Sequence, residues 1–172
     1  MADQRFQGMA GVYRVAMELA LRGTTSYFPS VDVGVDLISG IGKRVQVKSA
    51  ILRTADHGNY PSSQVPGYFF CLGWGQKGSK QRLIRRPRKY SEEVDIVVLW
   101  GIDEDRLWIV PAAELDTTHG LLLRPGRTAP LVGGRKQSAR IYPYEGRWDL
   151  LVPSMGITNL PAQRGQAEKQ SD

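Results

Sequence analysis

Two stretches near the start of the chain alternate apolar and polar residues with a period of two. They are VGVDLIS, residues 33–39, and KRVQVKS, residues 43–49, with Gly40 and Gly42 between them. A period of two is typical of strands that bury one face. The pattern therefore predicts a β-hairpin over residues 33–49.

A helix is predicted before this hairpin, over residues 8–22. Apolar residues recur there at helical spacing, and Gly23 follows as a stop signal. The predicted buried stripe of this helix consists of Met9, Val12, Ala16 and Leu19.

Further apolar runs follow the hairpin. GYFFCLGW (67–74) and VDIVVLWG (94–101) are almost uniformly apolar, which predicts central strands covered on both faces. RLWIVP (106–111) predicts another strand after an acidic turn, and Pro111 opens a short helix, PAAELD. This order predicts an α/β or α+β sheet domain.

Stretches rich in turn formers or charge separate these elements. Residues 53–66, 75–89 and 124–137 are predicted loops, and residues 161–172 a disordered tail. We therefore expect one domain over residues 1–160, with the basic loop 75–89 inserted into it.

Composition narrows the class of protein. The chain has 172 residues, 41% of them hydrophobic, and four Trp, as a folded core requires. Trp108 is the safest assignment to that core, whereas His57 and His119 are expected at the surface. The lone Cys71 excludes an intrachain disulfide and fits a reducing compartment. No apolar run approaches the ~20 residues of a membrane span, and the first residues lack a signal-peptide core. We expect a cytoplasmic protein that does not enter membranes.

Positive charge is concentrated in one segment. The formal net charge is +6, and residues 77–89 hold seven basic residues and no acid. They are Lys77, Lys80, Arg82, Arg85, Arg86, Arg88 and Lys89. A basic loop can bind a phosphate backbone without reading sequence, but the same run is also common in a solvated loop.

The hairpin carries the candidate chemistry. A three-residue loop, Gly40 to Gly42, would pair Ser39 with Lys43 and therefore Asp36 with Gln46. On that register Asp36, Gln46 and Lys48 cluster on one face.

A carboxylate and an amide oxygen are hard ligands suited to Mg²⁺ or Mn²⁺. An adjacent ammonium can stabilise charge that develops on a phosphate. The alternative is a hairpin whose polar residues face solvent and form no site.

The pair VGVDLIS and VQVKSA resembles the core motif of the PD-(D/E)xK nuclease superfamily, in which an acidic residue on one strand precedes (E/Q)xK on the next. GVYRVAMELALRGTTSYFP looks like the family's first helix. KYSEEVDIVVLWGIDEDRLWIVPAAEL is similar to strands of the small branch that contains group I intron homing endonucleases and uncharacterised prokaryotic relatives. The resemblance spans roughly residues 8–116 and implies a restriction-endonuclease-like core, an N-terminal helix packed on a central mixed sheet.

The resemblance also implies roles for individual residues. Asp36 would bind Mg²⁺ or Mn²⁺, with the side-chain oxygen of Gln46 and the backbone carbonyl of Val47. Lys48 would position the attacking water and stabilise the transition state. Glu18 would reach the site from the helix, although Arg14 and Arg22 lie at the spacing of simple helix ion pairs.

The leading hypothesis is thus a Mg²⁺-dependent endonuclease acting on DNA, with the basic segment binding the substrate. Cleavage of a duplex by so small a domain would suggest a homo-oligomer, by analogy with the family. Gln46 replaces the usual Glu and Val35 the usual Pro, so a non-catalytic nucleic-acid-binding module on a nuclease-like scaffold is the alternative. An RNA-directed nuclease would keep the site and change only the substrate.

Overall fold

The computed structural model describes residues 4–30, 34–53, 66–77, 83–86, 89–124 and 136–153. The main sheet has five strands in the order β1-β2-β3-β8-β9. Only the β3–β8 pair is parallel, so the sheet is mixed. Its strands are β1 (Ser26–Tyr27), β2 (Leu37–Ser39), β3 (Arg44–Ala50), β8 (Ile96–Gly101) and β9 (Arg106–Pro111).

Helix α1 (Gln4–Leu21) packs on one face of this sheet. Val15 and Leu19 of α1 are fully buried with Val45 and Val98 of the sheet. The predicted helix and the burial of Leu19 are thus confirmed, but the buried stripe passes through Val15 and not through Met9. Met9 is 53% exposed, because the helix has apolar residues on both sides and periodicity alone did not fix the inward one.

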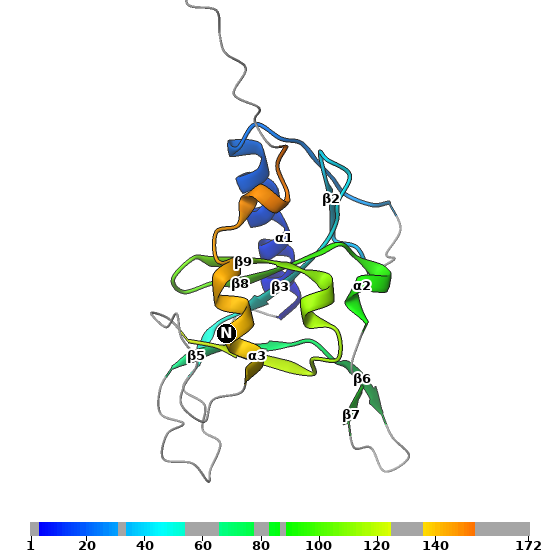
Figure 1. The fold of residues 1–172 in the computed structure, drawn as a ribbon, viewed down its shortest axis with the longest axis vertical. Helices are drawn as coiled ribbons and strands as arrows, with labels where there is room; N and C mark the ends of the chain where they lie inside the picture. The colour runs from blue at the N-terminus through cyan, green and yellow to red at the C-terminus, as the bar shows by residue number, and fades with distance from the viewer. Residues whose placement is uncertain are drawn as a thin grey trace, which may run out of the picture.

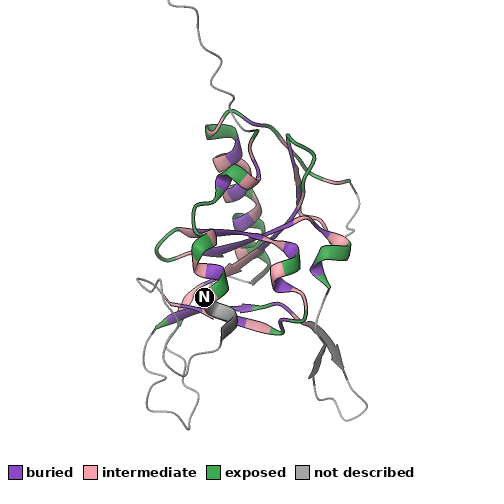
Figure 2. Cartoon of the chain, in the orientation of Figure 1, coloured by how far each residue is buried: buried purple, intermediate pink, exposed green. Residues whose placement is uncertain are grey.

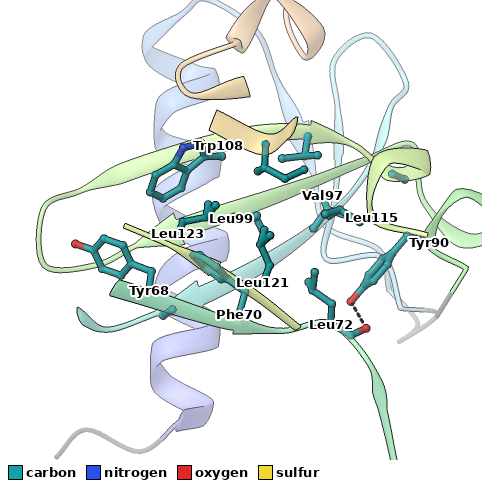
Figure 3. Close-up of a cluster of buried hydrophobic side chains, with 14 of the residues drawn as sticks. Tyr68, Phe70, Leu72, Tyr90, Val97, Leu99, Trp108, Leu115, Leu121 and Leu123 are labelled. Carbon is teal, nitrogen blue, oxygen red and sulfur yellow. Dashed lines mark hydrogen bonds between the residues drawn. The ribbon is translucent and has the colours of Figure 1, made fainter. Parts of the chain in front are cut away.

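A three-stranded sheet in the order β10-β5-β4 packs on the other face of the main sheet. Its strands are β4 (Leu52–Arg53), β5 (Gly67–Cys71) and β10 (Gly120–Leu123). Figure 3 shows the core between the two sheets, in which Trp108 is fully buried and packs against the rings of Tyr68 and Phe70. The core position predicted for Trp108 is therefore confirmed.

The two strands predicted to be covered on both faces differ in burial. All six residues of β8 are buried, as predicted for a central strand covered on both faces. β5 is covered on one face only, since Phe69 is 45% exposed and Cys71 is exposed. The run GYFFCLGW was therefore misread as doubly covered: its outward-facing residues are as apolar as its inward ones.

The predicted basic loop contains a hairpin. β6 (Trp74–Lys77) pairs antiparallel with β7 (Leu83–Arg86) as a separate two-stranded sheet. Figure 1 shows this hairpin projecting from the body of the protein.

Short helices complete the described chain. They are α2 (Tyr90–Glu93), η2 (Ala112–Leu115), α3 (Lys136–Ile141), η3 (Tyr142–Tyr144) and η4 (Trp148–Leu150). The tail predicted over residues 161–172 and most of the loops predicted over 53–66 and 124–137 lie outside the described residues. Within the described part of the chain, no helix is long and apolar enough to span a bilayer.

Candidate active site

The hairpin β2–β3 has the predicted register. Leu37 pairs with Val45, and the amide of Ser39 donates to the carbonyl of Lys43 at 2.9 Å. Gly42 has a φ of 80°, the left-handed conformation expected at the end of a three-residue loop. The glycine pair that suggested this turn therefore fixes which residues face each other.

Asp36 departs from this register at the end of β2. Its amide donates to the carbonyl of Val45 at 2.9 Å, although Val45 is already the partner of Leu37. Two successive residues thus face one partner, as in a β-bulge, and bulges redirect a side chain out of the simple alternation. The predicted pairing of Asp36 with Gln46 consequently holds only approximately. Gly34, with a φ of 76°, was the signal of this irregularity in the sequence.

The bulge brings the Asp36 carboxylate to the backbone of Val47. Asp36 Oδ2 accepts a hydrogen bond from the Val47 amide at 2.6 Å. In an extended strand the N–H and C=O of one residue point to the same side, so the Val47 carbonyl faces this same edge of the sheet. The structure therefore unites one carboxylate and one backbone carbonyl beyond the last paired residues of β2.

Gln46 and Lys48 flank this point on β3. Val45 and Val47 belong to the core beneath α1, so the two polar residues that alternate with them point to the opposite face of the sheet. The Gln46 side chain is buried, with 6% exposure, and Lys48 is half-buried. Burial of a polar amide in this position is costly unless it is bonded, and Gln46 does have partners in the fold.

Glu18 is paired with two arginines of its own helix. Its carboxylate contacts the guanidinium of Arg14 at 2.7 Å and that of Arg22 at 3.2 Å. Arg14 in turn binds both carboxylate oxygens of Asp105, in the β8–β9 turn. The Glu18 carboxylate is thus engaged by arginines of its own helix, and its role beside Asp36 stays a prediction.

The Glu18 cluster lines a shallow hollow of about 390 Å³ between α1 and the chain around Trp148. The pKa of Asp105 is lowered chiefly by its hydrogen bond with Arg14. Partial desolvation acts in the opposite direction, and a hydrogen bond from the Trp100 indole lowers the pKa further. Arg14 and Arg22, which α1 contributes to this hollow, are thus already in ion pairs with acidic residues.

Asp95 also has a structural partner. Burial opposes its ionisation, but the amide and guanidinium of Arg44 outweigh burial, and the pKa of Asp95 is lowered. His119 is exposed and contributes its backbone carbonyl to Leu72 and Gly73, whereas His57 lies outside the described residues. Tyr90 is buried and donates to the Leu72 carbonyl at 3.1 Å (Figure 3).

The oxygen donors near β3 can be compared with the ligands that divalent cations prefer. One carboxylate, one amide oxygen and one backbone carbonyl are hard ligands of the type Mg²⁺ and Mn²⁺ prefer. No group of three or more His, Cys, Asp or Glu suited to a metal occurs in the described ranges. The donor set therefore fits one weakly held cation better than a pair of cations.

Of the predicted DNA-binding residues, Lys77, Arg85 and Arg86 lie in the β6–β7 hairpin. Lys89 is described too, and its ammonium contacts Glu92 at 2.9 Å, which raises the Lys89 pKa. The remaining three, Lys80, Arg82 and Arg88, lie outside the described residues.

A solved structure has a similar fold. A bacterial homing endonuclease, I-Ssp6803I, superimposes with a TM-score of 0.62 over 85% of this chain and 90% of its own, at 16% sequence identity. The two proteins share a fold. No protein-family model matches the sequence, and no curated protein does. The endonuclease fold, an N-terminal helix on a mixed α/β sheet, confirms the predicted fold class.

Proposed function

We propose that this protein is a metal-dependent endonuclease that hydrolyses phosphodiester bonds of DNA at the β2–β3 hairpin. The observation that carries the proposal is the hydrogen bond between Asp36 and the Val47 amide. It positions an acidic side chain beside the residue between Gln46 and Lys48, on a fold shared with a homing endonuclease. The resemblance of the sequence to the PD-(D/E)xK motif supports the same site.

Each residue of the hairpin has a distinct task in this proposal. Asp36, with oxygens of Gln46 and Val47, would hold Mg²⁺ or Mn²⁺, and such an ion when bound supplies positive charge to a phosphate and to the water that attacks it. Lys48 contributes a second positive charge, carried on a strand held by β8 rather than on a loop. A fixed cation is effective because it needs little reorganisation as charge develops on the phosphate.

Substrate binding is assigned to the basic segment 77–89. DNA is a polyanion, and a protein with net charge +6 attracts it over a distance. The β6–β7 hairpin holds three of the seven basic residues. It projects from the body of the protein, as a hairpin that lies along a duplex must (Figure 1).

The test is nicking of supercoiled plasmid with Mg²⁺, with Mn²⁺ or with a chelator. Asp36→Asn keeps an oxygen that can accept from the Val47 amide but removes the charge, and we expect it to lose at least 100-fold in nicking rate, roughly what a positioned catalytic group contributes. Lys48→Ala should lose a similar factor. Nicking that persists in chelator, or in both variants, would contradict the proposal.

Asp103→Asn is the matched control. Its carboxylate also accepts from a strand amide, that of Leu52 at 2.5 Å, but on the loop after β8. We expect wild-type nicking from this variant. Equal losses of nicking in Asp36→Asn and Asp103→Asn would show only that the fold needs carboxylates that accept hydrogen bonds from strand amides.

A specific observation also favours a second candidate, a binding module without catalysis. The Asp36 carboxylate already satisfies a backbone amide, which is a sufficient structural reason for an acid at this position. On this alternative, salt-sensitive DNA binding is equal in wild type, Asp36→Asn and Lys48→Ala, and no nicking occurs with either metal.

A further inference from the structure

The outward face of α1 is apolar from residue 6 to residue 21, after the exposed Arg5 of its first turn. Between Phe6 and Leu21, the exposed positions of this helix carry only apolar or aromatic residues: Phe6, Gly8, Met9, Ala10, Tyr13, Met17, Ala20 and Leu21. Phe6 is 67% exposed and Leu21 is 73% exposed. Figure 2 shows exposed segments recurring along α1. A surface helix ordinarily turns polar residues outward, so this face is the reverse of the usual pattern.

The charged residues of the same stretch are turned away from that face. Arg14 and Glu18 are bonded to each other, and Arg14 is also bonded to Asp105 of the β8–β9 turn. Arg22 bonds to Glu18 and lies over the ring of Trp148 at 4.7 Å. Beyond Arg5, the outward face of α1 is thus without charge, because Arg14, Glu18 and Arg22 pair with one another and with Asp105.

The area of this face is large for a monomer. Phe28 extends it, since its ring lies 5.9 Å from that of Tyr13. At roughly 150–250 Å² per aromatic side chain, the exposed parts of Phe6, Tyr13 and Phe28 amount to roughly 270–450 Å². The half-exposed Met9 and Met17, with Leu21, add to this. The sum exceeds most patches on monomers and approaches the ~800 Å² that each partner contributes to a stable interface.

The spacing of the face matches a second copy of itself. Residues 6, 10, 13, 17 and 20 follow one another by four, three, four and three, the spacing of a seam between two helices. In an antiparallel pair related by a two-fold axis at Tyr13, Phe6 lies opposite Ala20 and Met9 lies opposite Met17. The large Phe6 then faces a small residue, as close packing of two helices requires, and the flexible methionines face each other.

We propose that the outward face of α1 is the interface of a homodimer, in which two α1 helices pack antiparallel about a two-fold axis at Tyr13. A two-fold interface uses one patch twice, so charge on it would meet like charge. The absence of charge from residues 6–21 of this face and the fit of Phe6 against Ala20 both suit an identical partner. The interface lies on the α1 side of the sheet and leaves the edge at Val47 uncovered.

The test uses charge at the axis, measured as solution mass by sedimentation over a range of concentrations. Wild type should be a dimer. Tyr13→Glu and Tyr13→Lys should each associate at least tenfold more weakly, because position 13 faces itself. An equimolar mixture of the two variants should recover the dimer, since opposite charges then meet.

Tyr27→Glu is the control, because Tyr27 has the same 59% exposure as Tyr13 but lies on β1, paired with Ile38. It should remain dimeric. Met17→Glu provides a second disrupting variant, and circular dichroism checks that each variant is folded. A monomeric wild type, dimers that persist in Tyr13→Glu and Met17→Glu, or a mixture that stays monomeric would each overturn the proposal. The readout is mass, so the result does not depend on whether the protein cuts DNA.

Discussion

At the scale of single residues, Asp36 combines two roles that a substitution can separate. Its carboxylate accepts from the Val47 amide at a point where β2 has stopped pairing with β3. The sequence predicted the carboxylate and the strand on which it lies. It did not predict the bulge, because a bulge depends on the hydrogen bond from the Asp36 amide to the Val45 carbonyl rather than on a repeating pattern.

Stability should therefore respond differently to two changes at this residue. Asp36→Ala leaves the Val47 amide without its acceptor and should lower the free energy of unfolding by about 1–3 kcal/mol. Asp36→Asn retains an acceptor oxygen and should cost less than half as much. Urea unfolding followed by circular dichroism measures both, and equal losses would show that charge, rather than the hydrogen bond, stabilises this edge.

At the scale of elements, the long and regular ones were predictable and the short ones were not. The hairpin β2–β3, β8, β9 and α1 all have a period or an uninterrupted apolar run. β1 and β4 have two residues each, too few to show any pattern, and they exist because a neighbouring strand offers hydrogen bonds. For the hairpin β6–β7 the sequence predicted a loop, because its many charged residues obscure the alternating pattern of a strand.

This hairpin should determine the salt dependence of DNA binding. Arg85→Ala with Arg86→Ala removes two cations from β7, and the slope of log K against log salt should fall in magnitude by roughly 1.8, about 0.9 per phosphate contact. Lys89→Ala, whose ammonium already contacts Glu92, should change the slope less. Fluorescence anisotropy in chelator separates binding from cleavage. An unchanged slope in the double variant would move the DNA site away from β7.

At the scale of the whole molecule, the main sheet serves two hydrophobic cores. Adjacent residues of β8 belong to different ones: Val97 to the core against the second sheet and Val98 to the core beneath α1. The β8–β9 turn, through Asp105, additionally ties α1 to the sheet by a bidentate ion pair with Arg14. The sequence suggested only the helix pairing of Arg14 with Glu18, since the contact with Asp105 spans 91 residues.

Acid should weaken this tie. The pKa of Asp105 is lowered from 3.8, chiefly by its hydrogen bond with Arg14, so folding favours the ionised carboxylate. The stabilisation is present above the unfolded pKa of 3.8 and is lost as pH falls through the lower, folded value. Wild type should therefore lose more stability below pH 3.8 than Asp105→Asn does.

Urea midpoints measured from neutral pH downward test this expectation. Asp149→Asn is the control, because Asp149 pairs with Arg147 at the surface and spans no elements. The same acid sensitivity in wild type and Asp105→Asn would assign acid unfolding to other carboxylates, such as Asp95.

The parallel pairing of β3 with β8 has a consequence for the order of folding. The strand that carries Gln46 and Lys48 is held on one side by a hairpin partner a few residues away, but on the other by Val97 and Leu99, about fifty residues later. Contacts of such separation are slow to form. During synthesis, β3 is an open edge until residues 96–101 have emerged, and an open apolar edge is a template for pairing with another chain. The strand proposed to carry the catalytic residues is thus also an apolar edge of the newborn chain that is open to pairing with other chains.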